Sequence, residues 1–164
     1  MKRCASAICC ILVIFCLLGG CSSPEDRNII CQDLTFSLPT VFLDLSEESY
    51  AKDADFLYGR DKLAVMGLAE KKSGLKKMTL EEYTGLVVSG NKLACTPEKT
   101  PTGYRFTYET DIGGTPYTYT CGTVETAERF WIVQCYCPKA DAAGYQEMID
   151  QILGSLRAHD PKGN

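Results

Sequence analysis

The feature that most constrains the fold is Gly113-Gly114, which lies between two runs of alternating aromatic residues, 104–110 and 115–124. A two-residue Gly-Gly loop is typical of a β-hairpin with a primed turn, because both positions tolerate positive φ. If Ile112 pairs with Thr115, the register also pairs Tyr108 with Tyr119, Phe106 with Cys121 and Tyr104 with Thr123. The sequence therefore predicts an antiparallel hairpin with one aromatic face.

Residues 130–137 read as the next strand, bounded by Pro138. We expect Glu125 and Arg129 to close a three-residue loop, which would place Cys121 opposite Val133 and Tyr119 opposite Cys135, all on the aromatic face. Cys121 and Cys135 would then be diagonal neighbours, roughly 7 to 8 Å apart, which is beyond the span of a disulfide. A loop two residues longer would place these cysteines directly opposite each other, and a two-residue loop would place them on different faces.

The remaining elements follow from periodicity and capping. Strands are expected at residues 34–38, 54–58 and 63–69; the last is apolar on both sides, which indicates a central strand covered on both faces. Thr79 and Glu82 form a capping box that starts a helix ending at Gly90-Asn91. A second helix buries one face, with Asp141 near its start and Arg157 near its end; that face carries Tyr145, Met148, Ile149, Ile152 and Leu156.

The amino-terminal residues 1–20 resemble a bacterial lipoprotein signal peptide. Lys2 and Arg3 precede a short apolar segment that ends in Leu18-Gly19-Gly20-Cys21. The segment is shorter than the roughly 20 residues that a spanning helix needs. We expect cleavage before Cys21 and lipidation of this cysteine, which would anchor the chain to the extracytoplasmic face of the cell membrane. Residues 21–32 would then be the lipidated cysteine and a flexible tether, 33–158 a single domain and 159–164 a polar tail.

The charge of the mature chain argues against nucleic acid as a partner. Without Lys2 and Arg3, 15 basic residues face 21 acidic ones, whereas a phosphate backbone requires a basic surface. A basic group at Lys71-Lys72 and Lys76-Lys77 could touch anionic headgroups, although such groups are usually solvated loops. The aromatic residues could line a ligand groove or form core beneath a helix; they are Tyr104, Phe106, Tyr108, Tyr117, Tyr119 and Trp131.

Five cysteines follow Cys21, namely Cys31, Cys95, Cys121, Cys135 and Cys137. We expect buried and reduced thiols; a structural disulfide remains open, because the expected compartment is oxidising. The alternative is a thiol-dependent metal or redox site that uses Cys121, Cys135 and Cys137.

Catalytic signatures are weak. The only histidine, His159, lies beyond the second helix, and the carboxylate pairs Glu47-Glu48 and Glu81-Glu82 read as a solvated turn and a helix start. No cofactor is expected from the sequence. The interpretation is a non-catalytic binding or accessory protein with a possible protein partner in the cell envelope.

The order of these elements resembles the PsbP-like (Mog/PsbP) superfamily. The resemblance rests on "FSLP" at 36–39, "TLEEY" at 79–83, a Gly-Tyr-x-Phe strand at 103–106, "FWIV" at 130–133 and a last helix near "ILGSL" at 152–156. It implies an α+β fold in which helices sandwich a central antiparallel sheet. It also implies a binding or assembly role, as in photosystem II extrinsic subunits and many bacterial lipoproteins, and it carries no catalytic residues.

Overall fold

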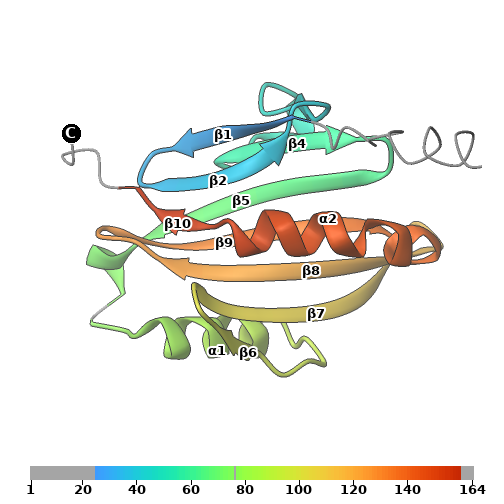
Figure 1. Ribbon diagram of the computed structural model, residues 1–164. Coiled ribbons are helices and arrows are strands. Elements are labelled where there is room, and N and C mark those ends of the chain that lie inside the picture. The colour runs from blue at the N-terminus through green and yellow to red at the C-terminus, as the bar shows by residue number, and fades with distance from the viewer. Residues whose placement is uncertain (1–24, 76, 160–164) are drawn as a thin grey trace, which may run out of the picture.

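The computed structural model describes residues 25–75 and 77–159, which form two antiparallel sheets and two α-helices (Figure 1). The larger sheet has the order β3-β4-β5-β9-β8-β7-β6 and the smaller one β1-β2-β10. The antiparallel strands of both sheets and the two helices agree with the α+β class expected from the sequence. The strands are β1 Asp26–Cys31, β2 Leu34–Pro39, β3 Leu43–Asp44, β4 Phe56–Arg60, β5 Leu63–Lys71, β6 Glu98–Thr100, β7 Gly103–Ile112, β8 Thr115–Glu125, β9 Arg129–Pro138 and β10 Arg157–Ala158; the helices are α1 Leu80–Gly90 and α2 Ala142–Gly154, with short 3-10 turns η2 Ser49–Ala51, η3 Lys72–Gly74 and η4 Lys139–Asp141.

The two faces of the larger sheet have different covers. On one face, Tyr83 of α1 packs against Phe130 and Ile132 of β9. On the other face, α2 and the smaller sheet share the cover, and their apolar residues join Trp131 and Val133 in the main core. Figure 1 shows α2 in front of β8 and β9, β1 and β2 at the top beside β4, and α1 at the bottom beside β6. We call the two faces of the larger sheet the α1 face and the α2 face.

The expected hairpin register is confirmed. Ile112 pairs with Thr115, Tyr108 with Tyr119, Phe106 with Cys121 and Tyr104 with Thr123. Gly113 and Gly114 have φ of 60° and 85°, as a primed turn requires. The two glycines thus fix which side chains of β7 and β8 share a face.

The expected register of β8 with β9 is wrong by one residue. Glu125 pairs with Phe130, so the loop has four residues, 126–129, and Cys121 lies opposite Gln134 rather than Val133. A one-residue slip moves every side chain of a strand to the other face. Cys135 therefore lies opposite Thr120 and occupies the α2 face, whereas Cys121 occupies the α1 face.

The tether expected at residues 21–32 is also corrected. Asp26–Cys31 forms β1, which pairs along its whole length with β2, so the domain begins earlier than residue 33. The proposed leader 1–20, Cys21 and most of the tail, 160–164, lie outside the described residues. His159 is described, and its backbone N–H donates to the carbonyl oxygen of Asp33 at 2.7 Å.

The helix ends follow the expectation from capping. Thr79 accepts from the backbone N–H of Glu82, whose side chain accepts from the backbone N–H of Thr79, which completes the capping box of α1. At the end of α2, the guanidinium of Arg157 donates to the carbonyl oxygens of Gly154 and Leu156. Arg157 thus satisfies the carbonyl of Gly154, the last residue of α2. No helix in the described residues, 25–75 and 77–159, is long and apolar enough to cross a membrane.

Strand β5 is less covered than its sequence indicates. Leu63 and Val65 are buried on the α2 face, but Met66 and Leu68 on the α1 face are only half-buried. Gly67 leaves room for the ring of Phe56, because a Cβ at Gly67 would lie 2.1 Å from that ring. Phe56 in turn stacks on Phe36 and Trp131, with ring centroids 5.0 and 6.0 Å away.

A buried carboxylate connects the turn between β1 and β2 with the distant hairpin of β8 and β9. Asp33, in the turn between β1 and β2, accepts from Trp131 Nε1 at 2.9 Å and from Thr126 Oγ1 at 2.6 Å. Arg129 lies 3.3 Å from the same carboxylate. The Thr126 hydroxyl also accepts from the backbone N–H of Arg129 at 3.1 Å, which closes the 126–129 loop. We call this group the Asp33 clamp.

The Asp33 clamp makes stability depend on pH. Burial acts to raise the pKa of Asp33, but the hydrogen bonds from Thr126 and Trp131 and the charge of Arg129 outweigh it and lower this pKa below 3.8. A lowered folded-state pKa stabilises the protein above the unfolded-state pKa, and this stabilisation is lost as pH falls through the folded-state value.

We predict that Asp33→Asn reduces the free energy of unfolding at pH 7 by about 3 kcal/mol, because an amide cannot accept from Thr126 and neutralise Arg129 at once. Urea unfolding at pH 7 and at pH 3 measures the effect. The difference between wild type and variant should shrink at pH 3. An equal difference at both pH values would contradict the role of the ionised carboxylate.

Candidate functional site

The α1 face carries an open groove between α1 and the exposed part of the sheet. Its volume is about 700 Å³. Strands β5, β7, β8 and β9 form the floor, and α1 with the segment after it forms one wall. We call it the aromatic groove; it is lined by Met66, Leu68, Glu70, Tyr83, Leu86, Val87, Asn91, Leu93, Phe106, Tyr108, Thr110, Ile112, Tyr119, Ile132 and Gln134.

A row of stacked tyrosines crosses the sheet at the groove floor. The rings of Tyr108 and Tyr119 lie 5.0 Å apart at an interplanar angle of 11°, and those of Tyr119 and Tyr136 lie 4.9 Å apart at 13°. These residues are direct cross-strand partners, so the confirmed register explains the stacking. Because the ring faces cover one another, the row does not provide an open aromatic face on which a flat ligand could stack.

One polar group at the groove is buried without a partner. Tyr83 is 1% exposed, and its hydroxyl has no hydrogen-bond partner among the described residues. Burial raises the pKa of Tyr83, and the nearby carboxylate of Glu70 raises it further. The hydroxyl is therefore protonated at neutral pH. A buried hydroxyl without a partner costs roughly 1 to 3 kcal/mol, which a bound donor or acceptor could recover.

The rim of the groove is apolar and exposed. Leu86 on α1 is 51% exposed and Ile112 at the end of β7 is 48% exposed. Met66 and Leu68 on the floor are half-buried. Isolated exposed apolar residues are common, but here they border one continuous hollow, which is typical of a contact surface.

The expected aromatic face is only partly correct. Tyr108 and Tyr119 line the groove, Phe106 is buried at its floor, and Tyr104 donates its hydroxyl to Glu81 of α1 at 3.1 Å. Trp131 is different, because the corrected register places it on the α2 face opposite Val124, where Asp33 holds its indole N–H. Sequence analysis missed Met66, Leu68, Glu70 and Tyr83 as groove residues.

The three thiols of the alternative metal site do not converge. Cys121 lies on the α1 face, and Cys135 and Cys137 lie on the α2 face. No group of three or more His, Cys, Asp or Glu side chains that could hold a metal ion is found in residues 25–75 and 77–159. Burial raises the pKa of Cys121 well above its usual value, and raises that of Cys135 to about 12. These thiols are therefore protonated and poorly reactive at neutral pH.

The other residues considered from sequence do not join the groove. Lys72 of the basic group pairs with Glu125 at 2.5 Å and lies 5.6 Å from the centroid of the Phe130 ring. His159 is held beside Asp33 through its backbone. The carboxylates of Glu81 and Glu82 accept from Tyr104 and Thr79, respectively.

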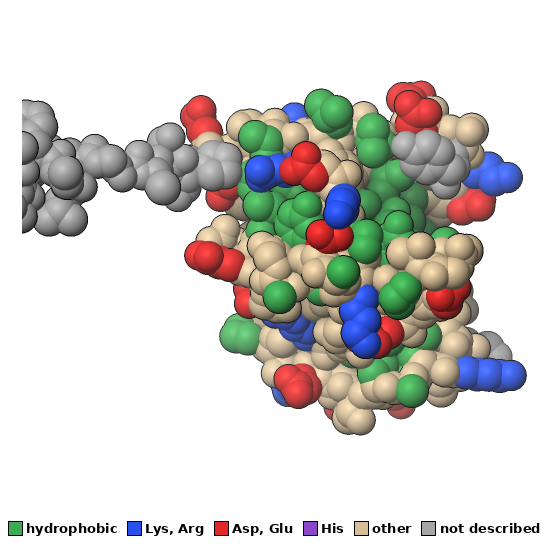
Figure 2. All heavy atoms as spheres, turned by 90° about the vertical axis from the view of Figure 1, so that its right-hand side faces the viewer, with side chains coloured by type: hydrophobic (Ala, Val, Ile, Leu, Met, Phe, Trp, Pro, Cys, Tyr) green, Lys and Arg blue, Asp and Glu red, His purple; other side chains and the backbone are tan. Residues whose placement is uncertain are grey.

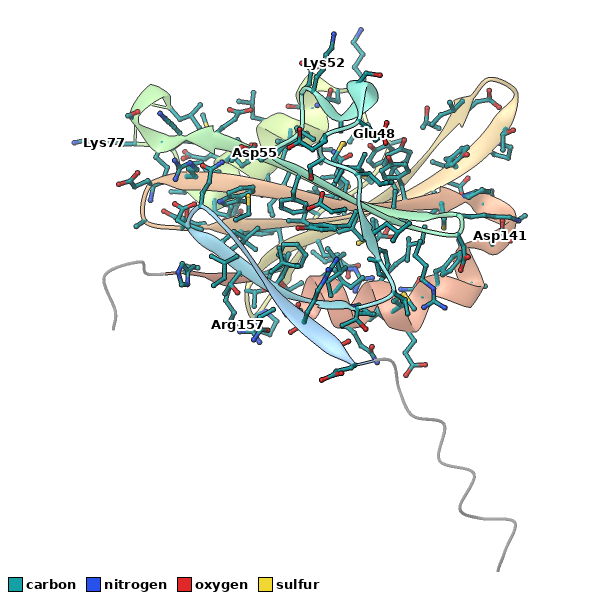
Figure 3. All side chains as sticks on the ribbon, turned by 90° about the horizontal axis from the view of Figure 1, so that it is seen from above. Glu48, Lys52, Asp55, Lys77, Asp141 and Arg157 are labelled. Atoms are coloured by element: carbon teal, nitrogen blue, oxygen red, sulfur yellow. The ribbon has the colours of Figure 1, made fainter. Side chains whose placement is uncertain are left out.

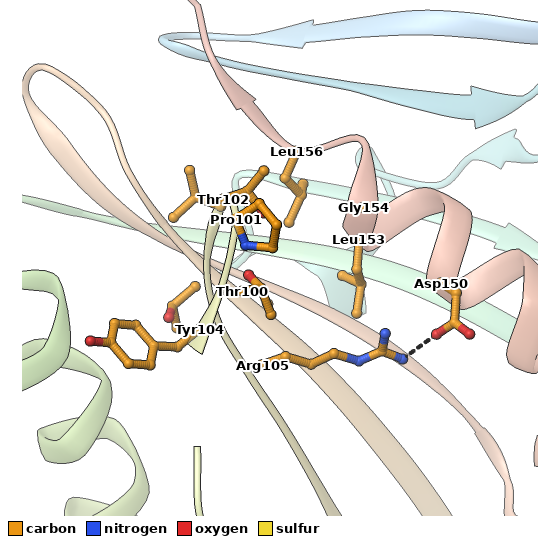
Figure 4. Close-up of a pocket in the computed structure, with 12 residues that line it drawn as sticks. Thr100, Pro101, Thr102, Tyr104, Arg105, Asp150, Leu153, Gly154 and Leu156 are labelled. Atoms are coloured by element: carbon orange, nitrogen blue, oxygen red, sulfur yellow. Dashed lines mark ion pairs between the residues drawn. The ribbon is translucent and has the colours of Figure 1, made fainter. Parts of the chain in front are cut away.

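A smaller hollow of about 250 Å³ lies on the α2 face, between the turn that joins β6 to β7 and the end of α2 (Figure 4). Arg105 forms an ion pair with Asp150 at its mouth. Gly122 forms part of its wall, and a Cβ there would lie 3.0 Å from Leu156. The two charges neutralise each other, so this hollow has less to offer a charged ligand than the aromatic groove has to offer an apolar one.

We predict two classes of thiol among the five cysteines that follow Cys21. Cys31 and Cys95 are half-buried, whereas Cys121, Cys135 and Cys137 are buried, and all five are free. A small thiol reagent should modify the first two slowly in the native state and all five after unfolding without reductant. A total of three thiols would reveal a disulfide and contradict the arrangement.

Comparison with known proteins gives a fold and no closer relationship. No family model matches the sequence, and no curated protein matches it. A Bacteroides thetaiotaomicron protein matches with a TM-score of 0.56 at 13% identity, over 84% of this chain and 49% of that chain. This chain therefore spans about half the length of that protein.

Two further solved structures are similar. Cyanobacterial PsbP (CyanoP) from Synechocystis has a TM-score of 0.53 at 8% identity, over 86% of this chain and 96% of CyanoP. LpqN from Mycobacterium tuberculosis, described as involved in cell envelope biogenesis, has a TM-score of 0.46 at 10% identity, over 83% of this chain and 91% of LpqN. The similarity to CyanoP spans nearly the whole described domain, and the chain has a PsbP-like fold.

Proposed function

We propose that the protein is a lipid-anchored, non-catalytic binding or accessory protein on the extracytoplasmic face of a cell membrane. Its aromatic groove would receive an apolar segment of a protein partner in the cell envelope. The observation that carries this proposal is the groove itself, a continuous hollow with half-buried apolar side chains on its floor and exposed ones on its rim.

The shape of the groove supports a peptide segment rather than a flat ring. Met66, Leu68 and Leu86 offer aliphatic contacts, while the stacked tyrosines present edges and hydroxyls. Gln134, Asn91 and the Tyr83 hydroxyl can provide a few hydrogen bonds that fix orientation. This mixture of apolar floor and few polar groups is typical of a site that receives an amphipathic segment.

Two further observations support the proposal. The leader and Cys21 resemble a lipoprotein precursor. The second observation is the PsbP-like fold shared with CyanoP. It supports the proposal because the resemblance to the PsbP-like superfamily implies a binding or assembly role.

The anchor has a direct test. Cys21→Ser should abolish incorporation of labelled palmitate and leave the leader attached, because it removes the thiol at the expected cleavage and lipidation site. Cys31→Ser serves as the matched control and should keep the label. Equal labelling of wild type and Cys21→Ser would overturn the anchor.

The groove is tested by site-specific photocrosslinking in the native envelope. A benzophenone amino acid at Leu86 should give a discrete adduct, whereas the same probe at Ile30 should not, because Ile30 is 60% exposed but lies on β1. Met66→Glu should remove the Leu86 adduct by placing a charge on the apolar floor. Identical adducts from both positions, no adduct, or an adduct that survives Met66→Glu would contradict the groove as the binding surface.

A further inference from the structure

The first described residue is fixed beside an exposed aliphatic turn. The carbonyl oxygen of Glu25 accepts from the backbone N–H of Thr40 at 2.9 Å, and Arg27 donates to the carbonyl oxygen of Phe42 at 2.8 Å. The next side chains along this turn are Val41 and Leu43, which are 44% and 68% exposed. The point where the chain enters the domain therefore lies next to two exposed aliphatic residues.

Only residues 22–24 separate Cys21 from Glu25. An extended chain spans at most about 3.6 Å per residue, so Glu25 lies within roughly 15 Å of Cys21. If Cys21 carries acyl chains, this distance keeps the turn at 40–43 close to the bilayer surface.

The surroundings of this turn are apolar and carry no excess of basic residues. Val41 and Leu43 border a shallow hollow of about 520 Å³ whose apolar lining includes Leu45, Leu57 and Leu63. Figure 2 shows hydrophobic side chains gathered on this end of the molecule, with acidic and basic side chains among them. Two basic residues there form ion pairs, Arg60 with Asp61 at 3.3 Å and Lys62 with Asp141 at 3.0 Å, and Arg27 donates to the carbonyl oxygen of Phe42.

We propose that Val41 and Leu43 insert into the boundary between headgroups and acyl chains and so fix the orientation of the anchored domain. This inference rests on the proposed anchor at Cys21. The acyl chains would supply the affinity, and the two aliphatic residues would choose which side of the domain faces the bilayer. Because acidic residues beside the turn, Asp26 and Asp44, offset the basic ones, the contact does not require anionic lipid.

This orientation has two consequences. The start of β1 lies at the top of Figure 1 and α1 at the bottom, so α1 would lie far from the membrane. The register aligns Leu43 with Gly59, Ala64 and Tyr136 on the α1 face, so the aromatic groove would lie beside the membrane contact and not on the opposite side of the domain. The basic group is excluded from the membrane contact, because Figure 3 shows Lys77 at the end of the molecule opposite Asp141 and far from the start of β1.

The test uses the mature, acylated protein in nanodiscs of phosphatidylcholine, with and without lipids brominated near the headgroup. Leu43→Trp adds an indole at the proposed contact, and Leu86→Trp adds one at a site of similar exposure on α1. Trp131 is fully buried in both variants and gives a common background. Bromine atoms quench tryptophan fluorescence at short range. If residue 43 inserts to a depth of roughly 5 to 10 Å, emission of the added indole should fall by about half in Leu43→Trp. Emission of the added indole in Leu86→Trp should remain unchanged.

The outcomes separate the two proposals. Equal quenching in the two variants, or none in Leu43→Trp, would overturn the inference while palmitate labelling leaves the anchor intact. Absence of palmitate from the wild type would overturn both. Quenching of Leu43→Trp only when anionic phosphatidylglycerol is present would also contradict the inference, because it would make charge rather than insertion the cause.

Discussion

The fold depends on how the 126–129 loop joins β8 to β9, because this loop decides which side chains face α1 and which face α2. Its length is set by hydrogen bonds between Thr126 and Arg129, and the Thr126 hydroxyl is held by the Asp33 carboxylate. Asp33 also holds the indole of Trp131, which lies at the centre of the main core. One buried carboxylate thus connects the first turn of the domain, its longest hairpins and its core.

The two outer surfaces of the domain follow from this register. Aromatic side chains of β7, β8 and β9 align on the α1 face, where one helix leaves part of the sheet open as a groove. On the α2 face, Cys135 and Cys137 are buried beneath α2 and the smaller sheet. The smaller sheet also carries the first described residues of the chain, and the turn that follows β2 leads to Leu43 at the edge of the α1 face.

Much of this architecture could be predicted from sequence, and the exceptions have physical causes. Gly113-Gly114 permits few turn geometries, so the pairing of Tyr108 with Tyr119 was predictable. The loop after Glu125 contains no glycine, and its length depends on Asp33, which is 93 residues away from Thr126. Local sequence does not reveal such a contact, and the resulting error of one residue placed Trp131 and Cys135 on the wrong face.

The groove was harder to predict for a related reason. Met66 and Leu68 alternate with Val65 and Gly67 in an apolar run, which predicts burial on both faces. Whether a helix is long enough to cover the second face is a tertiary property, and α1 ends at Gly90 before it covers the whole sheet. The strand β1 could have been found from Ile29-Ile30-Cys31, which is apolar and is followed by Gln32-Asp33 at the turn.

The most direct test of this account is the register of β8 and β9 in solution. Cross-strand nuclear Overhauser effects in the folded domain should connect the rings of Tyr119 and Tyr136, and should connect Cys121 with Gln134. Contacts that pair Tyr119 with Cys135 and Cys121 with Val133 would instead show a three-residue loop. That result would move Cys135 and Cys137 to the aromatic face, remove the stacking of Tyr119 on Tyr136 and contradict the groove.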